Sequence, residues 1–336
     1  MLLLLLSCTP SPVEASSSKP PATSTPPAEE LRGLWITRWG WSSPQDLDRI
    51  LEQADQAGIN AVFFQVRGSF DAFYLGGLEP LNPRLDGSWD PLDHVIAQAH
   101  ARDMQVHAWM NTFPLWRGGD PPPADHPAAL HPDWWLRVEG QPMAQNSSYV
   151  FADPASPQVR AHIAAVAEDL ESRYALDGLH LDYVRYPGQD FDEVDPAHVT
   201  ATVKGVQDTL EIQLTAAVWS VHTNRWGWSG VSQGMADYSQ DSHGWLQSGL
   251  LDGAVPMIYW PTTEPSGERL DFATLAADHV QRAGGRPVYA GIDTEHLDAA
   301  QVQACVEASR EAGAAGFVLF ESKHALPKLS ALNLQP

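Results

Sequence analysis

Residues 177–187 read Asp-Gly-Leu-His-Leu-Asp-Tyr-Val-Arg-Tyr-Pro. The apolar run that follows Asp177 has one acid, Asp182, inside it. Because side chains alternate along a strand, Asp182 shares a face with His180, whereas Leu179 and Leu181 share the other. Both faces are apolar enough to be buried. An unpaired charge loses on the order of several kcal/mol on leaving water, so a buried acid needs a partner or a task. The stretch predicts a buried strand that runs to the final proline and carries either a catalytic or a structural carboxylate.

Seven further apolar runs recur along the chain, and helical periodicity fills most of the intervals between them. With residues 178–186, the runs are 33–39, 60–67, 105–111, 213–220, 253–260, 287–293 and 316–322. Ser-Pro pairs at 43–44 and 156–157 are typical of a helix N-cap and first turn. Eight strand and helix units in about 300 residues predict an α/β fold, a single (β/α)8 TIM barrel. A doubly wound open sheet is the alternative, but residues 37–41, Thr-Arg-Trp-Gly-Trp, lack its glycine-rich phosphate turn.

The first 30 residues differ from the rest in composition. Residues 1–8 form an apolar stub whose end, Leu-Leu-Ser-Cys, resembles a bacterial lipobox with Cys8 as the acylated residue. Residues 9–30 are rich in Pro, Ser and Thr and predict a flexible linker. We expect the folded domain to span residues 31–336, in an exported lipoprotein of the cell envelope, facing the periplasm or held in an outer membrane. A degenerate secretory signal without lipid is the alternative.

Composition excludes several classes of function. The formal net charge of −22 argues against nucleic acid as a partner, because phosphate binding needs clustered Lys and Arg. Besides Cys8 the sequence has one cysteine, Cys305, whose helical spacing from Val302 and Val306 is typical of a core residue. The sequence contains no H-x-H, H-E-x-x-H or G-x-S-x-G motif, so we expect neither a catalytic metal nor a serine triad, and no cofactor.

Barrel enzymes place their active sites at the carboxyl ends of the strands, and polar side chains collect there in this sequence. Hydrolysis of a glycosidic bond usually uses two carboxyl groups, about 5 Å apart for retention and roughly 6.5–9.5 Å for inversion. Asp182 is the candidate nucleophile or charge stabiliser, and Glu79 and Asp293 are the leading candidate proton donors. Residues expected to hold the substrate are Trp39, Arg67, Asp71, Trp109, Asn111, Arg185, Tyr186, Tyr259, Trp260 and Glu321. Asp71 and Glu321 also remain open as the second carboxyl group.

The segment from 113 to 152 is too long for an ordinary connection and shows little periodicity. Such a loop on a barrel often forms a wall of the substrate site. Indole rings stack on the C–H faces of sugars, and six Trp residues lie in predicted loops after strands, although each one singly could be core packing. These candidates for a glycan platform are Trp39, Trp41, Trp134, Trp135, Trp226 and Trp228.

An ordered set of motifs resembles the bacterial family 10-like glycosyl hydrolases. The motifs lie at residues 32–35, 60–67, 71–74, 78–80, 90–92, 107–111, 131–134 and 174–182. The resemblance implies a (β/α)8 glycoside hydrolase, often exported or lipid-anchored, with the Asp182 strand in the active site. Some members resemble outer-membrane lipoproteins that cut peptidoglycan glycan strands stripped of their peptides. This chain has Tyr183 where the family often has a second acid.

The function expected from residues and resemblance together is hydrolysis of O-glycosidic bonds in a cell-envelope polysaccharide, in particular peptidoglycan strands. The partners would be that glycan and a membrane, through lipid on Cys8. A glycan-binding lipoprotein on a catalytically silent barrel is one alternative, and a hydrolase of another surface or dietary oligosaccharide is a second.

Overall fold

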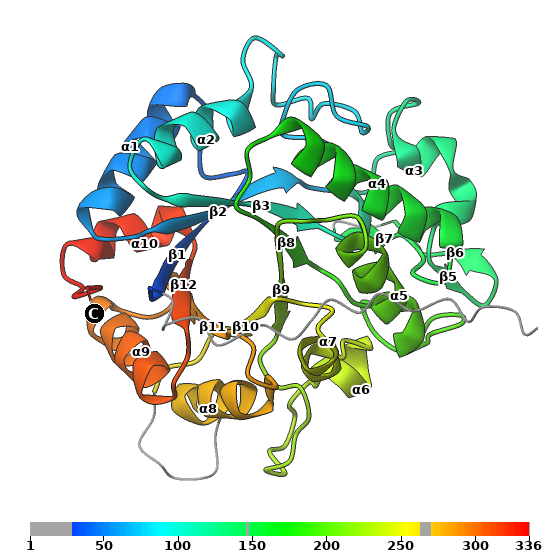
Figure 1. Cartoon of the computed structure of the whole chain (residues 1–336). Helices are drawn as coiled ribbons and strands as arrows, with labels where there is room; N and C mark the ends of the chain where they lie inside the picture. The colour runs from blue at the N-terminus through cyan, green and yellow to red at the C-terminus, as the bar shows by residue number, and fades with distance from the viewer. Residues whose placement is uncertain (1–28, 146–147, 263–269, 336) are drawn as a thin grey trace, which may run out of the picture.

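A closed barrel of eight parallel strands forms the centre of the protein (Figure 1). The computed structural model describes residues 29–145, 148–262 and 270–335. Each strand pairs with its neighbours in chain order, and the last strand pairs in parallel with the first. The strands are β1 (Leu31–Ile36), β2 (Ala61–Arg67), β3 (Gln105–Asn111), β8 (Gly178–Asp182), β9 (Gln213–Trp219), β10 (Gly253–Ile258), β11 (Tyr289–Asp293) and β12 (Gly316–Phe320). Ring closure confirms the predicted TIM barrel and excludes the open sheet.

Helices surround the barrel and cover its outer face (Figure 1). They are α1 (Pro44–Gln56), α2 (Pro91–His100), α4 (Pro157–Arg173), α5 (Pro196–Gln207), α6 (Gly234–Tyr238), α7 (Ser242–Ser248), α8 (Phe272–Arg282), α9 (Ala299–Glu311) and α10 (Ser322–Leu329). Both predicted serine caps are confirmed, since Ser43 accepts a hydrogen bond from the Asp46 amide and Ser156 from the Val159 amide. Within the described part of the chain, every helix is too short or too polar to span a membrane.

The two faces of each barrel strand pack against different surroundings. Trp35, Phe63, Trp109 and Val255 form a cluster inside the barrel, whereas the alternate residues pack outward against the helices. On β8 the outward residues Leu179 and Leu181 belong to the outer core, as the alternation predicted. The same alternation brings Asp182 to the inner face at the carboxyl end of the barrel.

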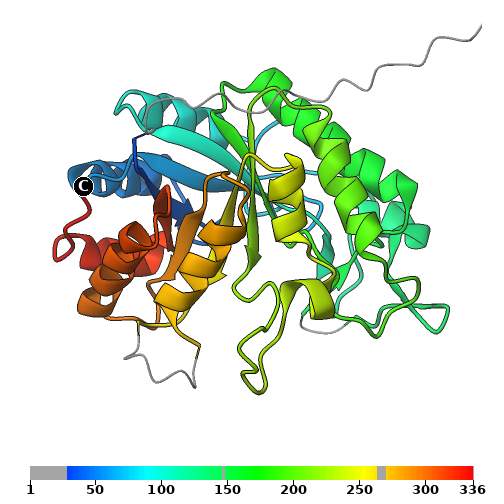
Figure 2. The ribbon, with the colours of Figure 1, turned by 60° about the horizontal axis from the view of Figure 1, so that its bottom comes forward.

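The long segment between β3 and α4 folds into small elements beside the mouth of the barrel. They are β4 (Pro114–Arg117), α3 (Pro127–Leu130), η1 (Pro132–Trp134), β5 (Arg137–Val138), β6 (Gln141–Pro142) and β7 (Tyr149–Phe151). β4 and β7 pair antiparallel, and so do β5 and β6. None of these strands exceeds four residues, so none produced a detectable periodicity. Figure 2 shows residues 220–233, yellow-green, projecting beyond the strands where β9 ends.

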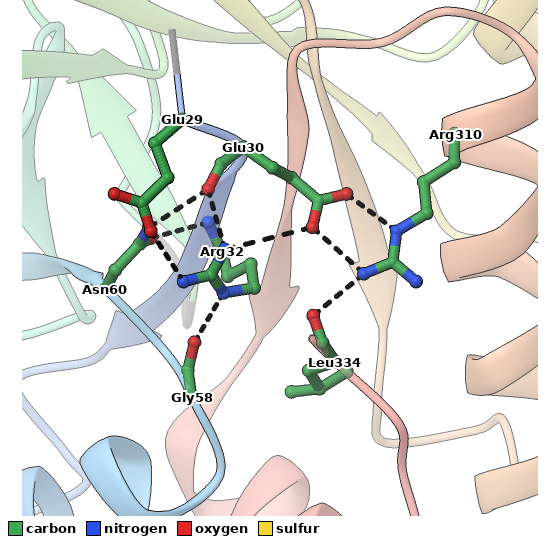
Figure 3. A network of polar contacts seen from close by, with 7 residues as sticks. All are labelled: Glu29, Glu30, Arg32, Gly58, Asn60, Arg310 and Leu334. Atoms are coloured by element: carbon green, nitrogen blue, oxygen red, sulfur yellow. Dashed lines mark hydrogen bonds and ion pairs between the residues drawn. The ribbon is translucent and has the colours of Figure 1, made fainter. Parts of the chain in front are cut away.

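At the opposite end of the barrel, a polar network fixes the start of β1 (Figure 3). Glu30 accepts two hydrogen bonds from Arg310 of α9, at 2.7 and 2.9 Å. Arg310 also donates to the Leu334 carbonyl near the C-terminus at 2.8 Å. Arg32 donates to the carbonyls of Gly58 and Glu30. The described chain therefore begins on the face away from Asp182.

Candidate active site

A cavity of about 250 Å³ opens at the carboxyl end of the barrel strands. Six of the predicted site residues line it: Trp39, Trp109, Asn111, Asp182, Arg185 and Tyr259. The remaining walls are Trp35, Thr37, Arg38, Gln65, Tyr149, Tyr183, Ala217, Met257 and Phe320. Among these described lining residues Asp182 is the only acid, so its carboxylate is the focus of any proton transfer in the cavity.

Asp182 is the last residue of β8, and its side chain is only 10% exposed. Burial raises the pKa of Asp182 above its usual value, while Arg185, the Tyr183 amide and the Trp109 indole oppose that shift. The Tyr183 amide donates to Oδ1 at 2.6 Å, and Arg185 Nη1 lies 3.7 Å from the same oxygen. A carboxyl group that holds its proton more firmly than usual suits general acid catalysis.

The strand ends at Asp182, four residues earlier than the sequence predicted, because Tyr183 has a left-handed backbone with φ of 51°. Such a conformation costs a non-glycine residue about 1–3 kcal/mol and persists only where the surrounding structure holds it in place. The turn brings Tyr183 and Arg185 to the cavity beside Asp182. The Arg185 guanidinium lies over the Tyr183 ring, 4.5 Å from its centroid. The strained residue therefore orders the wall next to the acid.

A second wall consists of neutral polar groups. Gln65 donates from Nε2 to Asn111 Oδ1 at 3.1 Å and accepts at Oε1 from the Arg38 amide at 3.1 Å. The side-chain oxygen of Asn111, Oδ1, therefore already accepts a hydrogen bond. Its buried side-chain nitrogen, Nδ2, has no partner within the described residues. Burial first, then the charges of Asp182 and Asp293, raise the pKa of Tyr259 well above its usual value. Asn111 and Tyr259 therefore present uncharged donors to a ligand.

Glu79 and Arg67 lie outside the cavity lining and form a buried ion pair. Arg67 donates from Nε and Nη2 to the two Glu79 oxygens at 2.7 and 2.6 Å, and Glu79 Oε1 lies 2.9 Å from His162 Nε2. Despite the opposing effect of burial, Arg67 and His162 lower the pKa of Glu79 to about 2. A permanently ionised, buried carboxylate argues against the predicted role as proton donor. Instead, Arg67 also donates to the carbonyls of Asn111 and Thr112, so the pair supports the end of β3.

Asp293 and Glu321 lie at the ends of neighbouring barrel strands, behind the cavity lining. Asp293 Oδ2 is 2.7 Å from His296 Nδ1, and its Oδ1 accepts the amide of Glu295 at 2.7 Å. Glu321 accepts a hydrogen bond of 2.6 Å from Thr37 Oγ1, and Thr37 lines the cavity. Both acids are buried. Neither carboxylate is among the described residues that line the cavity.

The remaining predicted residues are dispersed. Tyr186 is fully buried beside His198, its hydroxyl 3.0 Å from Nδ1, and Trp260 is absent from the lining of the cavity. Trp41, Trp134 and Trp228 are core residues, because each is less than 10% exposed. The predicted platform therefore does not extend to these three rings. Cys8 lies outside the described residues, and Cys305 is a buried core thiol, as expected.

A second cavity, of about 600 Å³, shares Arg38 and Trp39 with the first. Asp71, Trp116, Arg117 and His126 contribute to its walls. Trp39 is 52% exposed and stands between the two spaces. The Arg38 and Arg84 guanidinium groups lie over its ring, 4.7 and 4.8 Å from the centroid, at the point where a chain-like ligand would leave the acid.

Two further observations delimit the site. Another hollow, of about 920 Å³ between α1 and α10, has no acidic residue among its described walls. The described His, Cys, Asp and Glu side chains form no group able to hold a metal ion.

The sequence interpretation missed two residues of the cavity wall, Arg38 and Tyr149. They contact each other through a 2.7 Å hydrogen bond from Arg38 Nη2 to the Tyr149 hydroxyl. Their positions 111 residues apart give no local signal.

A barrel with a buried acid at the carboxyl ends of its strands is the architecture of a TIM-barrel enzyme, and comparison with known proteins gives the family. The chain belongs to the family described as Glycosyl hydrolase-like 10, whose model matches residues 30–197. Glycosyl hydrolase DigH of Escherichia coli K12 is 27% identical over an alignment 363 residues long, gaps included. The alignment covers 87% of this chain and 80% of that protein. Glycosyl hydrolase YngK of Bacillus subtilis is 26% identical over 284 residues, covering 69% and 54%.

Solved structures support the same fold. The PgaB (BpsB) glycoside hydrolase domain from Bordetella bronchiseptica superposes with a TM-score of 0.63 at 15% identity, covering 92% of this chain and 99% of that domain. An endo-beta-1,4-mannanase from Thermotoga petrophila gives a TM-score of 0.56 at 13% identity, covering 87% and 68%. Membership of the Glycosyl hydrolase-like 10 family makes the protein a glycosidase, whose substrate is a carbohydrate.

Proposed function

We propose that the protein hydrolyses O-glycosidic bonds within a cell-envelope polysaccharide, in particular the glycan strand of peptidoglycan. The observation that carries this proposal is the pair of adjoining cavities, which share Arg38 and Trp39 and total more space than a single sugar needs. A groove that extends past the catalytic acid favours cleavage within a chain. Trp39, which is 52% exposed, would contact a sugar ring beyond the scissile bond.

In the proposed chemistry, Asp182 is the proton donor to the leaving oxygen rather than the ionised nucleophile that the sequence suggested. The raised pKa of its carboxyl group supports that role. Asp293 is the proposed second carboxylate. Tyr259, whose pKa responds to both acids, would lie between them and the sugar as a hydrogen-bond donor. Asn111 Nδ2 and Arg185 would hold sugar oxygens.

Substrate comparison tests the proposal directly. Purified protein is incubated with peptide-free peptidoglycan strands, chitin oligomers and α-glucans, and the products are separated by chromatography. The proposal expects shortening of the peptidoglycan strands by the wild type and none by Asp182→Asn. Turnover of α-glucans alone would assign the enzyme to another oligosaccharide. Binding of a glycan with no cleavage of any would favour the glycan-binding alternative.

Export and lipid attachment at Cys8 belong to the same proposal, since an enzyme of envelope glycans has to reach the envelope. The Glu30–Arg310 network supports this arrangement, because the described chain begins at the end of the barrel opposite Asp182. An anchor at the amino end would leave the cavity free to face the glycan. Fractionation of cells after labelling with a palmitate analogue tests it: Cys8→Ala should lose the label and leave the membrane fraction.

A further inference from the structure

The guanidinium group of Arg185 lies against two aromatic rings beside Asp182. Its central carbon is 4.5 Å from the centroid of the Tyr183 ring and 5.3 Å from that of the Trp219 ring. The Arg185 side chain is only 10% exposed, and its buried Nη1 has no hydrogen-bond partner among the described residues. Aromatic faces attract cations, most strongly where water is excluded. The two rings therefore hold a buried positive charge that hydrogen bonds leave incompletely satisfied.

Trp219 is itself fixed by its neighbours. It is the last residue of β9, on the same face of the strand as Ala217, which lines the cavity. Its backbone amide donates to Oε1 of the fully buried Gln240 at 2.6 Å, and its indole Nε1 donates to the Ser232 carbonyl at 2.9 Å. The ring also packs on Tyr238 of α6, with centroids 4.4 Å apart. The indole is therefore a fixed surface for the guanidinium group.

Arg185 stops short of a close ion pair with Asp182. Its Nη1 lies 3.7 Å from Asp182 Oδ1, whereas a charge-assisted hydrogen bond between such groups is about 2.7–2.9 Å long. At the shorter distance the arginine would favour the ionised carboxylate more strongly, and an ionised carboxylate has no proton to donate. At the observed distance burial still outweighs the arginine, and the pKa of Asp182 remains raised.

Three other titratable or charged groups act on Asp182, each from a different part of the site. Arg38 acts from the loop after β1, Tyr183 from the turn after Asp182, and Tyr259 from the end of β10. Asp293, at the end of β11, acts on Tyr259 in turn. None of these groups belongs to β9. A change in the titration of Asp182 that follows a substitution at Trp219 therefore reports on the arginine that Trp219 holds.

We propose that Trp219 is a positioning residue, which holds the Arg185 guanidinium group against Tyr183 and so prevents a close ion pair between Arg185 and Asp182. The inference rests on the glycan hydrolysis proposed above, in which Asp182 is the proton donor. Trp219 is outside the described lining of the cavity, so it acts on the acid through Arg185. Without the indole, the guanidinium group loses one of its two aromatic faces, and the acid with which it already pairs is the nearest alternative contact.

The test follows the titration of the Asp182 carboxyl group in the whole protein. Carbon NMR of a sample isotope-labelled at its aspartate carboxyl carbons measures it, and Asp182→Asn identifies the signal. Asp182 should titrate about one pH unit lower in Trp219→Leu than in the wild type, because the released guanidinium group can close on the carboxylate. On a glycan that the wild type cleaves, the alkaline limb of the kcat/KM profile should move by the same amount in the same direction.

Conservative and double variants separate the aromatic face from the other contacts of the side chain. Trp219→Phe keeps a ring and should titrate close to the wild type. Both single variants lose the hydrogen bond to Ser232, so the difference between them isolates the ring. Arg185→Met/Trp219→Leu should titrate as Arg185→Met does, since the tryptophan acts only through the arginine. If Trp219→Leu does not fold, Trp219→Met gives the same comparison.

Trp226→Leu is the matched control. Arg225 lies over the Trp226 ring, 5.5 Å from its centroid, and this ring is outside the described lining of the cavity. Removing it should leave the titration of Asp182 in place. A shift as large as that of Trp219→Leu would show that loss of any such ring disturbs the acid, and would overturn the specific role of Trp219.

The sign of the change decides the outcome. An unchanged or higher titration point of Asp182 in Trp219→Leu would reduce Trp219 to a packing residue, whatever the stability or activity of that variant. An equal shift in Trp219→Phe would trace the effect to the lost hydrogen bond and also overturn the proposal. The NMR measurement needs no turnover. If the wild type cleaves no glycan, a lower titration point in Trp219→Leu alone still supports the positioning role while hydrolysis fails.

Discussion

The side chain of Asp182 combines burial with incomplete charge compensation, and this combination determines what it can do. Only one of its oxygens is held closely, by the Tyr183 amide at 2.6 Å. The Arg185 guanidinium, at 3.7 Å, is too far for a strong hydrogen bond. Burial therefore outweighs the favourable contacts, and the pKa of the carboxyl group rises.

Replacing Asp182 by Asn keeps the shape of the side chain and removes the acidic proton that the carboxyl group could transfer. We expect a loss of turnover of about a hundredfold or more, the range of general acid catalysis, with the thermal unfolding temperature little changed. Initial rates on a glycan with a poor leaving group measure the effect. The Asp182→Asn substitution should lower turnover less on an activated aryl glycoside, because the leaving group of that substrate needs no proton. An equal loss on both substrates would contradict the proton-donor role.

Arg185 gives a prediction about pH. Its positive charge favours the ionised form of Asp182, so Arg185→Met removes an effect that lowers the pKa of the acid. The pKa of Asp182 should then rise further, and the alkaline limb of the kcat/KM profile should move to higher pH. The position of that limb is independent of any loss of substrate affinity. Arg49→Gln, which is distant from the cavity, should leave the limb in place; a shift to lower pH in Arg185→Met would refute the assignment.

At the scale of elements, closure of the barrel depends on one glycine. Gly316 opens β12 with φ of 154°, and it pairs with Leu31 of β1 on one side and Tyr289 of β11 on the other. A Cβ at this position would lie 2.0 Å from the Leu31 carbonyl oxygen. No side chain fits there unless the first and last strands separate.

Gly316→Ala should therefore lower the free energy of unfolding by about 3 kcal/mol, through overpacking and the loss of pairing between β12 and β1. Gly205→Ala is the matched control, because Gly205 lies inside α5 and an added Cβ would meet no atom within 4 Å. There the same substitution should stabilise by about 1 kcal/mol through helix propensity. Urea denaturation of the two variants measures both values. Similar stabilities would show that the strands can adjust at the closure point.

The elements also show how far the sequence can be interpreted without coordinates. All eight barrel strands were predicted, because continuous apolar runs with alternating inner and outer faces leave a strong pattern. The position of Asp182 at the mouth followed from the same pattern. The pairing of Glu79 with Arg67 and His162 could not be predicted from the sequence, because contacts between distant segments leave no periodicity. The left-handed backbone of Tyr183 could not be predicted either, because the surrounding fold imposes it.

For the whole molecule, the folded core contains histidines, inside the barrel and under its helices, that have to remain neutral. His107 is fully buried, stacked on Phe63 with ring centroids 4.6 Å apart. Burial lowers the pKa of His107 to about 4, and it lowers that of His279 to about 4. His180, which lies 2.9 Å from the Thr215 hydroxyl, shifts in the same direction. These groups belong to different strands and helices, so protonating them should lower the free energy of unfolding of the entire fold.

The sign of the pH dependence follows from these directions. Between about pH 6.5 and pH 4 the unfolded chain binds protons that the folded barrel excludes, so stability falls as the pH decreases. A histidine whose pKa drops to about 4 contributes on the order of 3 kcal/mol to that loss. Glu79, with a pKa of about 2, adds a further loss only below about pH 4.5. Urea denaturation at intervals from pH 7 to pH 4 should show a steady fall that is shallower in His107→Gln. If the curve is flat between pH 6.5 and pH 5, the buried histidines accept protons without opening the barrel.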